Sequence, residues 1–235
     1  MTHMHIPDGI LPLWLWGGGF AVTAALLALC LFRLRGMDHR KGIPLLGALS
    51  AAMLVAMNLE IFPLAYHLNL SVAAGILLGP SLGFIAAFIV NIMLALVGHG
   101  GITVMGLNTL LLGAEEFFGH TVFFLLPSTV PVFWRGAAAT VVALLLVSLI
   151  LIAIVGASHA EVEAFLHDHE GKDAGGPEAR TSASLRTFAV MVLTLGAIGW
   201  VIEGAVTGAV IRFISRVKPD LLSHVLHGAS AERRP

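Results

Sequence analysis

The chain has 235 residues, of which 57% are hydrophobic and 11% charged, and its mean hydropathy is +0.93. Globular domains are about 45–50% apolar and about 25% charged, so this composition excludes an ordinary water-soluble domain and indicates a membrane protein. The net charge of −1 excludes a basic nucleic-acid-binding surface, and the single cysteine, Cys30, excludes a disulfide framework or a thiolate metal site. Any metal chemistry would therefore use the 11 histidines, the carboxylates or backbone nitrogens.

The first nine residues, Met1–Gly9, contain no Lys or Arg and end in the turn signal Pro-Asp-Gly. A secretory signal peptide starts with a basic region, so this segment does not have the pattern of one. We expect it to stay on the mature protein.

Five apolar runs are long enough to cross about 30 Å of hydrocarbon as helices. They are Ile10–Phe32, Ile43–Phe62, Ile102–Leu126, Gly136–Gly156 and Leu185–Ile214. A sixth run, Leu70–Val97, is interrupted by Gly79-Pro80, where proline removes a backbone donor and predicts a kink or a chain reversal. We therefore predict an all-α polytopic membrane protein with six to seven transmembrane helices, built as one integral membrane domain over residues 1–235.

The positions of Lys and Arg predict the orientation, because basic loops stay on the cytoplasmic side. The basic residues that follow the first and last spans are Arg33, Arg35, Arg40, Lys41, Arg212, Arg216, Lys218, Arg233 and Arg234. We therefore expect a multi-pass protein of the inner or plasma membrane with its N-terminus outside and its C-terminus in the cytoplasm. The hydrophilic loop 157–184 would then lie outside, and the tail 215–235 inside.

An outer start and an inner end require an odd number of crossings, which the chain reaches if Leu70–Gly79 and Pro80–Gly98 are two short helices. About 28 residues at 1.5 Å each are too few for both of them to cross fully. A half-depth helix is tolerated only where protein encloses it. The spacing of Gly75, Gly79 and Gly83 would allow such helices to approach closely.

This arrangement brings His3, His5, His67 and His99 to the same outer side. Imidazoles suit nickel, cobalt, copper and zinc, although a single loop histidine at a membrane face is more often structural or solvated. The N-terminus adds a chelate of its own, because a free α-amine, a deprotonated amide and an imidazole form a flat nitrogen array that favours Ni(II) or Cu(II). Both Met1-Thr2-His3 and Met4-His5 offer such a frame.

Several strings of the chain carry a family resemblance. They are Met4-His5-Ile6-Pro7-Asp8-Gly9-Ile10-Leu11, His67-Leu68-Asn69-Leu70-Ser71, Gly98-His99-Gly100-Gly101-Ile102-Thr103 and Gly106-Leu107-Asn108. With them the chain resembles the CbiM/NikM family, the metal-specific substrate-binding subunits, or S components, of energy-coupling factor (ECF) transporters for cobalt and nickel. The resemblance implies the S-component fold with an extra N-terminal helix. It also implies Co2+ or Ni2+ as the transported substrate and no organic cofactor.

The resemblance further implies a metal site formed by Met4, His5 and His67, with the amine and amide nitrogens of the terminal Met-His pair as ligands. Family members begin at that pair, whereas this chain has three residues before it. Translation from Met4, removal of the leader, or a site rebuilt with His3 would each reconcile the difference. We favour a start at Met4.

Other polar residues have more than one possible role. His99 could gate the site or hydrogen-bond a ligand imidazole, or be a loop histidine bonded to backbone. Asn108 could hydrogen-bond a ligand or cap its helix. Glu203 lies inside the last span, where a carboxyl is costly unless paired, and we expect it to bond another helix. The roles of Glu115 and Glu116 are left open.

The chain contains no Gly-x-x-x-x-Gly-Lys-Ser/Thr phosphate loop, so other chains would have to supply energy for uphill transport. The resemblance implies a CbiQ/NikQ-type transmembrane coupling subunit, CbiO/NikO-type ATPase subunits and a small CbiN or NikN/NikL-type membrane subunit. A passive metal channel or secondary carrier is the main alternative. An intramembrane metalloenzyme would need a His-Glu-x-x-His helix, which is not the spacing of His120 from Glu115 and Glu116. Sequence leaves nickel versus cobalt open.

Overall fold

The computed structural model describes residues 12–35, 42–61, 66–98, 100–158 and 177–222. Its principal helices are α1 (Leu13–Leu34), α2 (Gly42–Asn58), α3 (Ser71–Leu96), α4 (Met105–Leu125), α5 (Val132–Ala157) and α7 (Pro177–Val217). Two strands, β1 (Glu60–Ile61) and β2 (Tyr66–His67), form a short antiparallel pair between α2 and α3. The all-α prediction is confirmed, because each strand is only two residues long.

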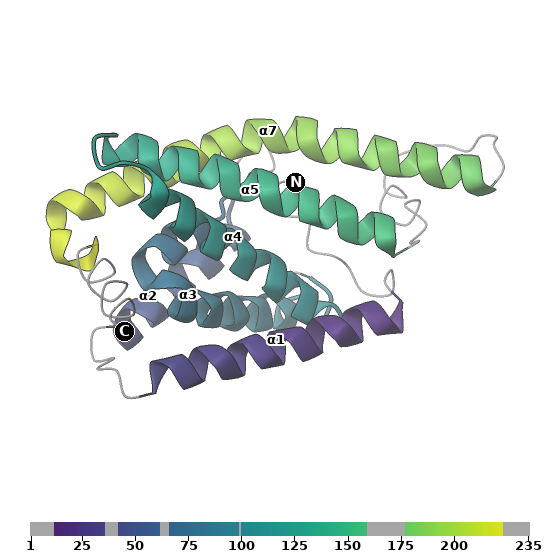
Figure 1. The fold of residues 1–235 in the computed structure, drawn as a ribbon, viewed down its shortest axis with the longest axis horizontal. Helices are drawn as coiled ribbons and strands as arrows, with labels where there is room; N and C mark the ends of the chain where they lie inside the picture. The colour runs from purple at the N-terminus through teal and green to yellow at the C-terminus, as the bar shows by residue number, and fades with distance from the viewer. Residues whose placement is uncertain (1–11, 36–41, 62–65, 99, 159–176, 223–235) are drawn as a thin grey trace.

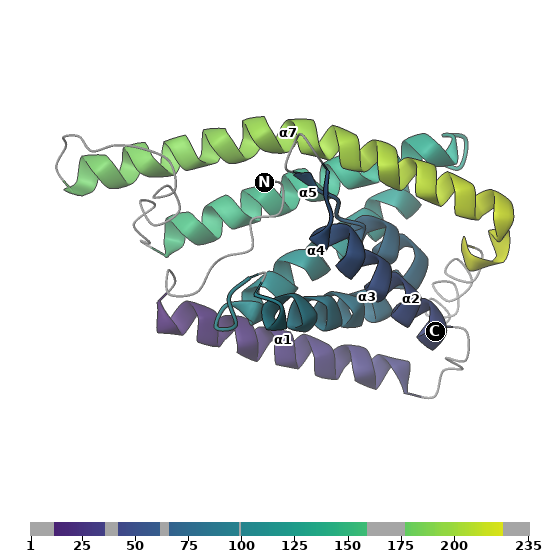
Figure 2. The same ribbon diagram turned by 180° about the vertical axis from the view of Figure 1, so that it is seen from behind.

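The helices lie roughly along one direction, with α5 and α7 at one edge, α1 at the opposite edge, and α3 and α4 between them (Figure 1). Helix α2 packs on α3 from the other side, as the reverse view shows (Figure 2). Helices α3 and α4 thus form the centre of the bundle. Most of the buried polar side chains belong to these two central helices or to the segment that leads into α3.

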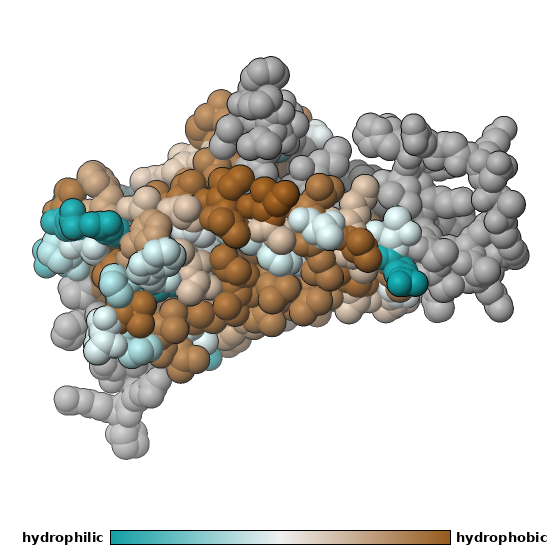
Figure 3. Space-filling view, turned by 90° about the horizontal axis from the view of Figure 1, so that it is seen from above, coloured by the Kyte–Doolittle hydropathy of each residue, from teal (hydrophilic) through white to brown (hydrophobic). Residues whose placement is uncertain are grey.

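The outer surface of the bundle is apolar, as a membrane protein requires. Four of the described helices are long and apolar enough to cross a membrane, namely α1, α3, α5 and the 185–217 part of α7. Figure 3 shows hydrophobic side chains along the middle of one face and hydrophilic ones toward its two ends. Exposed side chains such as Leu149 on α5 and Val201 on α7 would contact lipid there.

Helix α3 consists of two helical halves that meet at Gly79, whose φ of 74° and ψ of 173° are not helical. A Cβ atom on Gly83 would lie 3.6 Å from the Cα atom of Gly75. Eight residues of straight helix would separate these positions by about 12 Å, so the chain bends sharply at Gly79-Pro80. The predicted break and the predicted close approach of the glycines are confirmed.

The first half of α3 is enclosed by protein. All nine residues from Ser71 to Gly79 are buried. This is the environment that a half-depth helix needs, since lipid offers no partner to its free terminal N–H and C=O groups.

Two span boundaries differ from the sequence predictions. The second span was predicted to reach Phe62, but α2 ends at Asn58, whose side-chain amide donates to the carbonyl oxygen of Leu54 at 2.7 Å. The next residues enter β1, which hydropathy could not separate from an apolar helix. Helix α7 begins at Pro177, well before the predicted Leu185, because polar turns extend a helix beyond its apolar part.

Glycines allow the helices to touch backbone to backbone. A Cβ atom on Gly106 of α4 would lie 2.7 Å from the backbone nitrogen of Phe20 in α1, and the Thr23 hydroxyl donates to the Gly106 carbonyl oxygen at 2.8 Å. At the other edge, a Cβ atom on Gly136 of α5 would lie 3.1 Å from the Cα atom of Gly208 in α7. Such small-residue contacts are a main source of helix association in membranes.

The α1–α4 contact yields a stability prediction. Gly106→Ala would place a methyl group against backbone atoms that cannot move aside cheaply, and should destabilise the protein by about 1–3 kcal/mol. Gly17→Ala is the matched control, because no atom of the described ranges outside its own helix turn lies within 4 Å of its Cβ position. Thermal unfolding of the purified protein in detergent measures both. Equal melting temperatures for the two variants would contradict this account of the contact.

Candidate metal-binding site

His67 is the predicted metal ligand that the structure describes best. It is the last residue of β2 and pairs with Glu60 of β1, so the α2–α3 connection holds its backbone in an extended conformation. The side chain is half-buried and its Nδ1 atom is buried. An imidazole with a nitrogen shielded from bulk solvent can bind a metal ion that has shed part of its water shell.

The remaining predicted ligands are outside the part of the chain that the structure describes. These are Met4, His5, His3 and His99. Among the described residues there is no group of three or more His, Cys, Asp or Glu side chains that could hold a metal ion. A site at His67 would therefore need donors from the undescribed segments, as the Met4 and His5 prediction requires.

Asn108 does not cap the start of its helix. Helix α4 begins at Met105, and its N-cap residue is Val104, which makes no side-chain capping hydrogen bond. Asn108 lies one turn inside, with its backbone N–H donating to the carbonyl oxygen of Val104 at 3.0 Å and its side chain 4% exposed. The capping interpretation is wrong, and the interpretation of Asn108 as a buried hydrogen-bonding residue stays a prediction.

A buried polar cluster joins α4 to the segment that follows His67. The Asn69 side-chain amide donates to Glu115 Oε2 at 2.5 Å, and the Ser71 hydroxyl donates to the same oxygen at 2.7 Å. Asn69 Oδ1 in turn accepts the backbone N–H of Ser71 at 2.8 Å. All three side chains are at most 5% exposed. The cluster thus fixes the N-terminus of α3 to the middle of α4.

The electrostatics of this cluster are favourable to a carboxylate. Glu115 lies at the N-terminal end of α3, where unsatisfied backbone N–H groups make the local potential positive. Hydrogen bonds to an ionised acceptor are among the stronger ones in proteins. A buried carboxyl that would otherwise be costly in a membrane is therefore supported by two donors and a helix end.

The neighbouring Glu116 has a different environment. It is 1% exposed, and neither of its carboxyl oxygens has a hydrogen-bond partner among the residues that the structure describes. It lies against the bend of α3, where a Cβ atom on Gly83 would be 2.8 Å from Oε2 and one on Gly75 would meet the backbone of Glu116. The two adjacent glutamates therefore differ in their contacts. Glu203 of α7 is also buried, as expected for a carboxyl directed away from lipid.

Sequence reasoning assigned no role to Asn69 or Ser71, although both belong to a string that carries the family resemblance. A signal was present, since Asn followed by Ser just before an apolar run is typical of a helix start. Their partner could not be found in this way, because Glu115 is 46 and 44 residues away along the chain.

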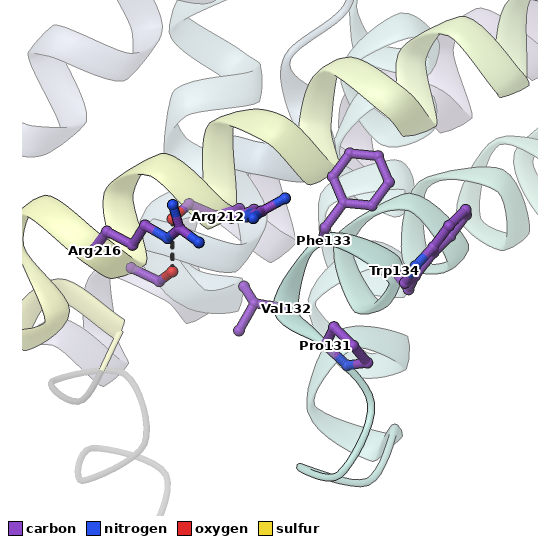
Figure 4. A pocket seen from close by; sticks show the side chains of 7 residues that line it. Pro131, Val132, Phe133, Trp134, Arg212 and Arg216 are labelled. Carbon is purple, nitrogen blue, oxygen red and sulfur yellow. Dashed lines mark hydrogen bonds between the residues drawn. The ribbon is translucent and has the colours of Figure 1, made fainter.

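A cavity of about 360 Å³ lies away from this cluster along the chain, between the start of α5 and the end of α7. It is lined by Pro131, Val132, Phe133, Trp134, Arg212, Ser215 and Arg216. Figure 4 shows the two arginines on the α7 side and the aromatic rings on the α5 side. Two guanidinium groups repel a divalent cation, so this cavity is not a candidate for the metal site.

The fold is that of a solved membrane transporter. A crystal structure described as a transition metal transporter superposes with a TM-score of 0.73, covering 99% of this chain and 100% of that one at 20% sequence identity. At that identity the likeness establishes the fold alone.

Residues 5–221 match the family CbiM, described as the cobalt uptake substrate-specific transmembrane region, and the chain belongs to this family. It is similar to a putative fused nickel transport protein NikMN of Archaeoglobus fulgidus, at 28% identity over 93% of this chain and 68% of the relative. It is also similar to a putative fused cobalt transport protein CbiMQ of Methanocorpusculum labreanum, at 26% identity over 93% of this chain and 36% of the relative.

The chain is therefore a multi-pass membrane protein of cobalt or nickel transport, of the CbiM type. The family is one of transport proteins.

Proposed function

We propose that the chain is the substrate-capture subunit of an ECF-type ABC importer for Co2+ or Ni2+, in which partner subunits hydrolyse ATP. One structural observation supports it most directly. The half-buried imidazole of His67 comes four residues before an enclosed half-depth helix, and its Nδ1 atom is buried, so a nitrogen donor is shielded by protein. Transport of a divalent cation requires such a protein-lined site.

The proposed ligands are the amine and amide nitrogens of Met4 and His5, the His5 imidazole and the His67 imidazole, with His3 or His99 as possible additional donors. Four nitrogen donors in one plane favour Ni(II), whereas imidazole by itself accepts Co(II) as well. Metal analysis of the isolated protein distinguishes the two substrates.

The binding test compares two histidines that the structure places differently. His67→Ala removes a proposed ligand and should abolish tight Ni2+ and Co2+ binding, measured by isothermal titration calorimetry on purified protein. His120→Ala is the control, because His120 lies on α4 with its Nδ1 atom 3.1 Å from the carbonyl oxygen of Gly75 and is not among the proposed ligands. Stoichiometric binding by His67→Ala would refute the assignment.

A second prediction concerns the amine ligand. A form of the protein that starts at Met4 presents a free α-amine beside His5, whereas in a form that starts at Met1 this nitrogen is part of a peptide bond. We expect the shorter form to bind Ni2+ at least tenfold more tightly in the same titration. Mass spectrometry of the protein isolated from its native host identifies the natural terminus. Equal affinities would show that the Met4 amine is not a ligand.

The names of two fused relatives support the proposed partners. Relatives that are named as fused CbiMQ and NikMN proteins support a CbiQ-type coupling subunit and a NikN-type small subunit for this chain. A CbiO/NikO-type ATPase pair would supply the energy. With the basic residues after α1 and at the end of α7 in the cytoplasm, the His67 side of the bundle faces outward and capture occurs from outside the cell.

Energy coupling separates the proposal from a passive channel or a secondary carrier. Metal uptake by cells that carry this protein should disappear when the partner ATPase is deleted, because the chain has no phosphate loop of its own. Uptake of radioactive Ni2+ or Co2+ measures the effect, and restoring the ATPase gene is the control. Undiminished uptake without the ATPase would favour a channel or carrier.

A further inference from the structure

We infer that Glu115 is a positioning residue for the His67 imidazole, which it controls through its hydrogen bonds to Asn69 and Ser71. The inference rests on the proposed function, in which His67 binds the metal. Its basis is the direct connection along the chain between the imidazole and the residues that Glu115 holds.

The first step is the short distance along the backbone. Only Leu68 separates His67 from Asn69, so their Cα atoms are at most about 7 Å apart. Asn69 is 1% exposed, and its amide bonds Glu115 through the nitrogen and the Ser71 N–H through the oxygen. A residue with both ends of its side chain fixed leaves its neighbour two positions away little freedom.

The second step is that His67 is held from its other side as well. Its pairing with Glu60 ties it to the end of α2, whereas the Glu115 bonds tie the following residues to α4. The imidazole therefore stands between two anchors that belong to different helices. Without Glu115 the anchor on the α4 side would be lost, while the strand pair could still form.

The third step is the free-energy cost of burying the Glu115 carboxylate. A carboxylate in the interior of a membrane protein is more costly than an apolar side chain of the same size, and hydrogen bonds compensate for this only in part. Glu115 is 5% exposed and uses one oxygen, Oε2, for both donors. Groups that hydrogen-bond a metal-binding imidazole directly typically affect metal affinity by about 10–100-fold, so for Glu115, which acts through Asn69 and Ser71, we expect an effect near the lower end of that range.

Adjacent Glu116 provides a matched control. It lies on the same helix, is also buried and carries the same group, but its carboxyl oxygens have no hydrogen-bond partner within the described part of the chain. Replacing Glu116 by leucine removes a buried carboxyl from α4, as Glu115→Leu does, but keeps the hydrogen bonds of Glu115 to Asn69 and Ser71.

The test uses the full chain in detergent, titrated with NiCl2 or CoCl2, and compares Glu115→Leu, Glu115→Gln and Glu116→Leu. Glu115→Leu should weaken metal affinity about tenfold and alter the d–d absorption spectrum of the bound ion. Glu115→Gln keeps one oxygen that can accept both bonds and should restore affinity to within a few-fold. Glu116→Leu should leave affinity and spectrum unchanged.

Ser71→Ala removes one hydrogen bond to Glu115 and keeps the carboxyl. It replaces Glu115→Leu in the test if that variant does not fold. A several-fold loss of metal affinity is then expected. Wild-type affinity and spectrum in a folded Glu115→Leu, or in Ser71→Ala, would overturn the inference. So would equal losses in Glu115→Leu and Glu116→Leu, which would indicate general destabilisation. If His67→Ala also binds normally, the proposed metal site fails; if only His67→Ala loses binding, the site stands and the positioning role falls.

Discussion

The requirement that every backbone polar group be satisfied away from water governs the centre of this protein. The chain between α2 and α3 leaves helical structure for a pair of two-residue strands, and then starts a short helix that ends at Gly79. Neither element could face lipid, because strands with open edges and free helix ends have unpaired N–H and C=O groups. The first half of α3 meets this requirement because all of its residues from Ser71 to Gly79 are buried, and the irregular backbone before it carries His67.

The bend of α3 and the two buried glutamates of α4 are parts of the same helix–helix contact. Gly75 and Gly83 come into contact because the chain turns at Gly79-Pro80, and α4 packs against this pair of glycines. Two successive residues of α4, Glu115 and Glu116, then contact different parts of α3. One carboxyl fixes the start of α3 through two hydrogen bonds, while the next lies against the bend.

The sequence predicted the spans well because membrane helices are defined by length and apolarity, which one chain shows directly. The break in α3 was also predictable, since proline after glycine cannot continue a helix. The β1–β2 pair was missed because strands of two residues have no periodic signal and lie beside an apolar helix. The partners of Glu115 were missed because contacts between distant helices leave no mark in local sequence. Among the proposed ligands, only His67 lies in the described part of the chain, and the roles of Met4 and His5 stay predictions.

The attachment of α1 has a mechanical consequence. Its two buried residues, Gly19 and Thr23, both lie in the first half of the helix, where the Gly106 crossing holds it. This crossing lies nearer the amino end of α1, since about 9 Å separates Gly19 from Leu13 and about 17 Å separates Thr23 from Leu34. A displacement of α4 would therefore be transmitted to α1 through the amino half of that helix.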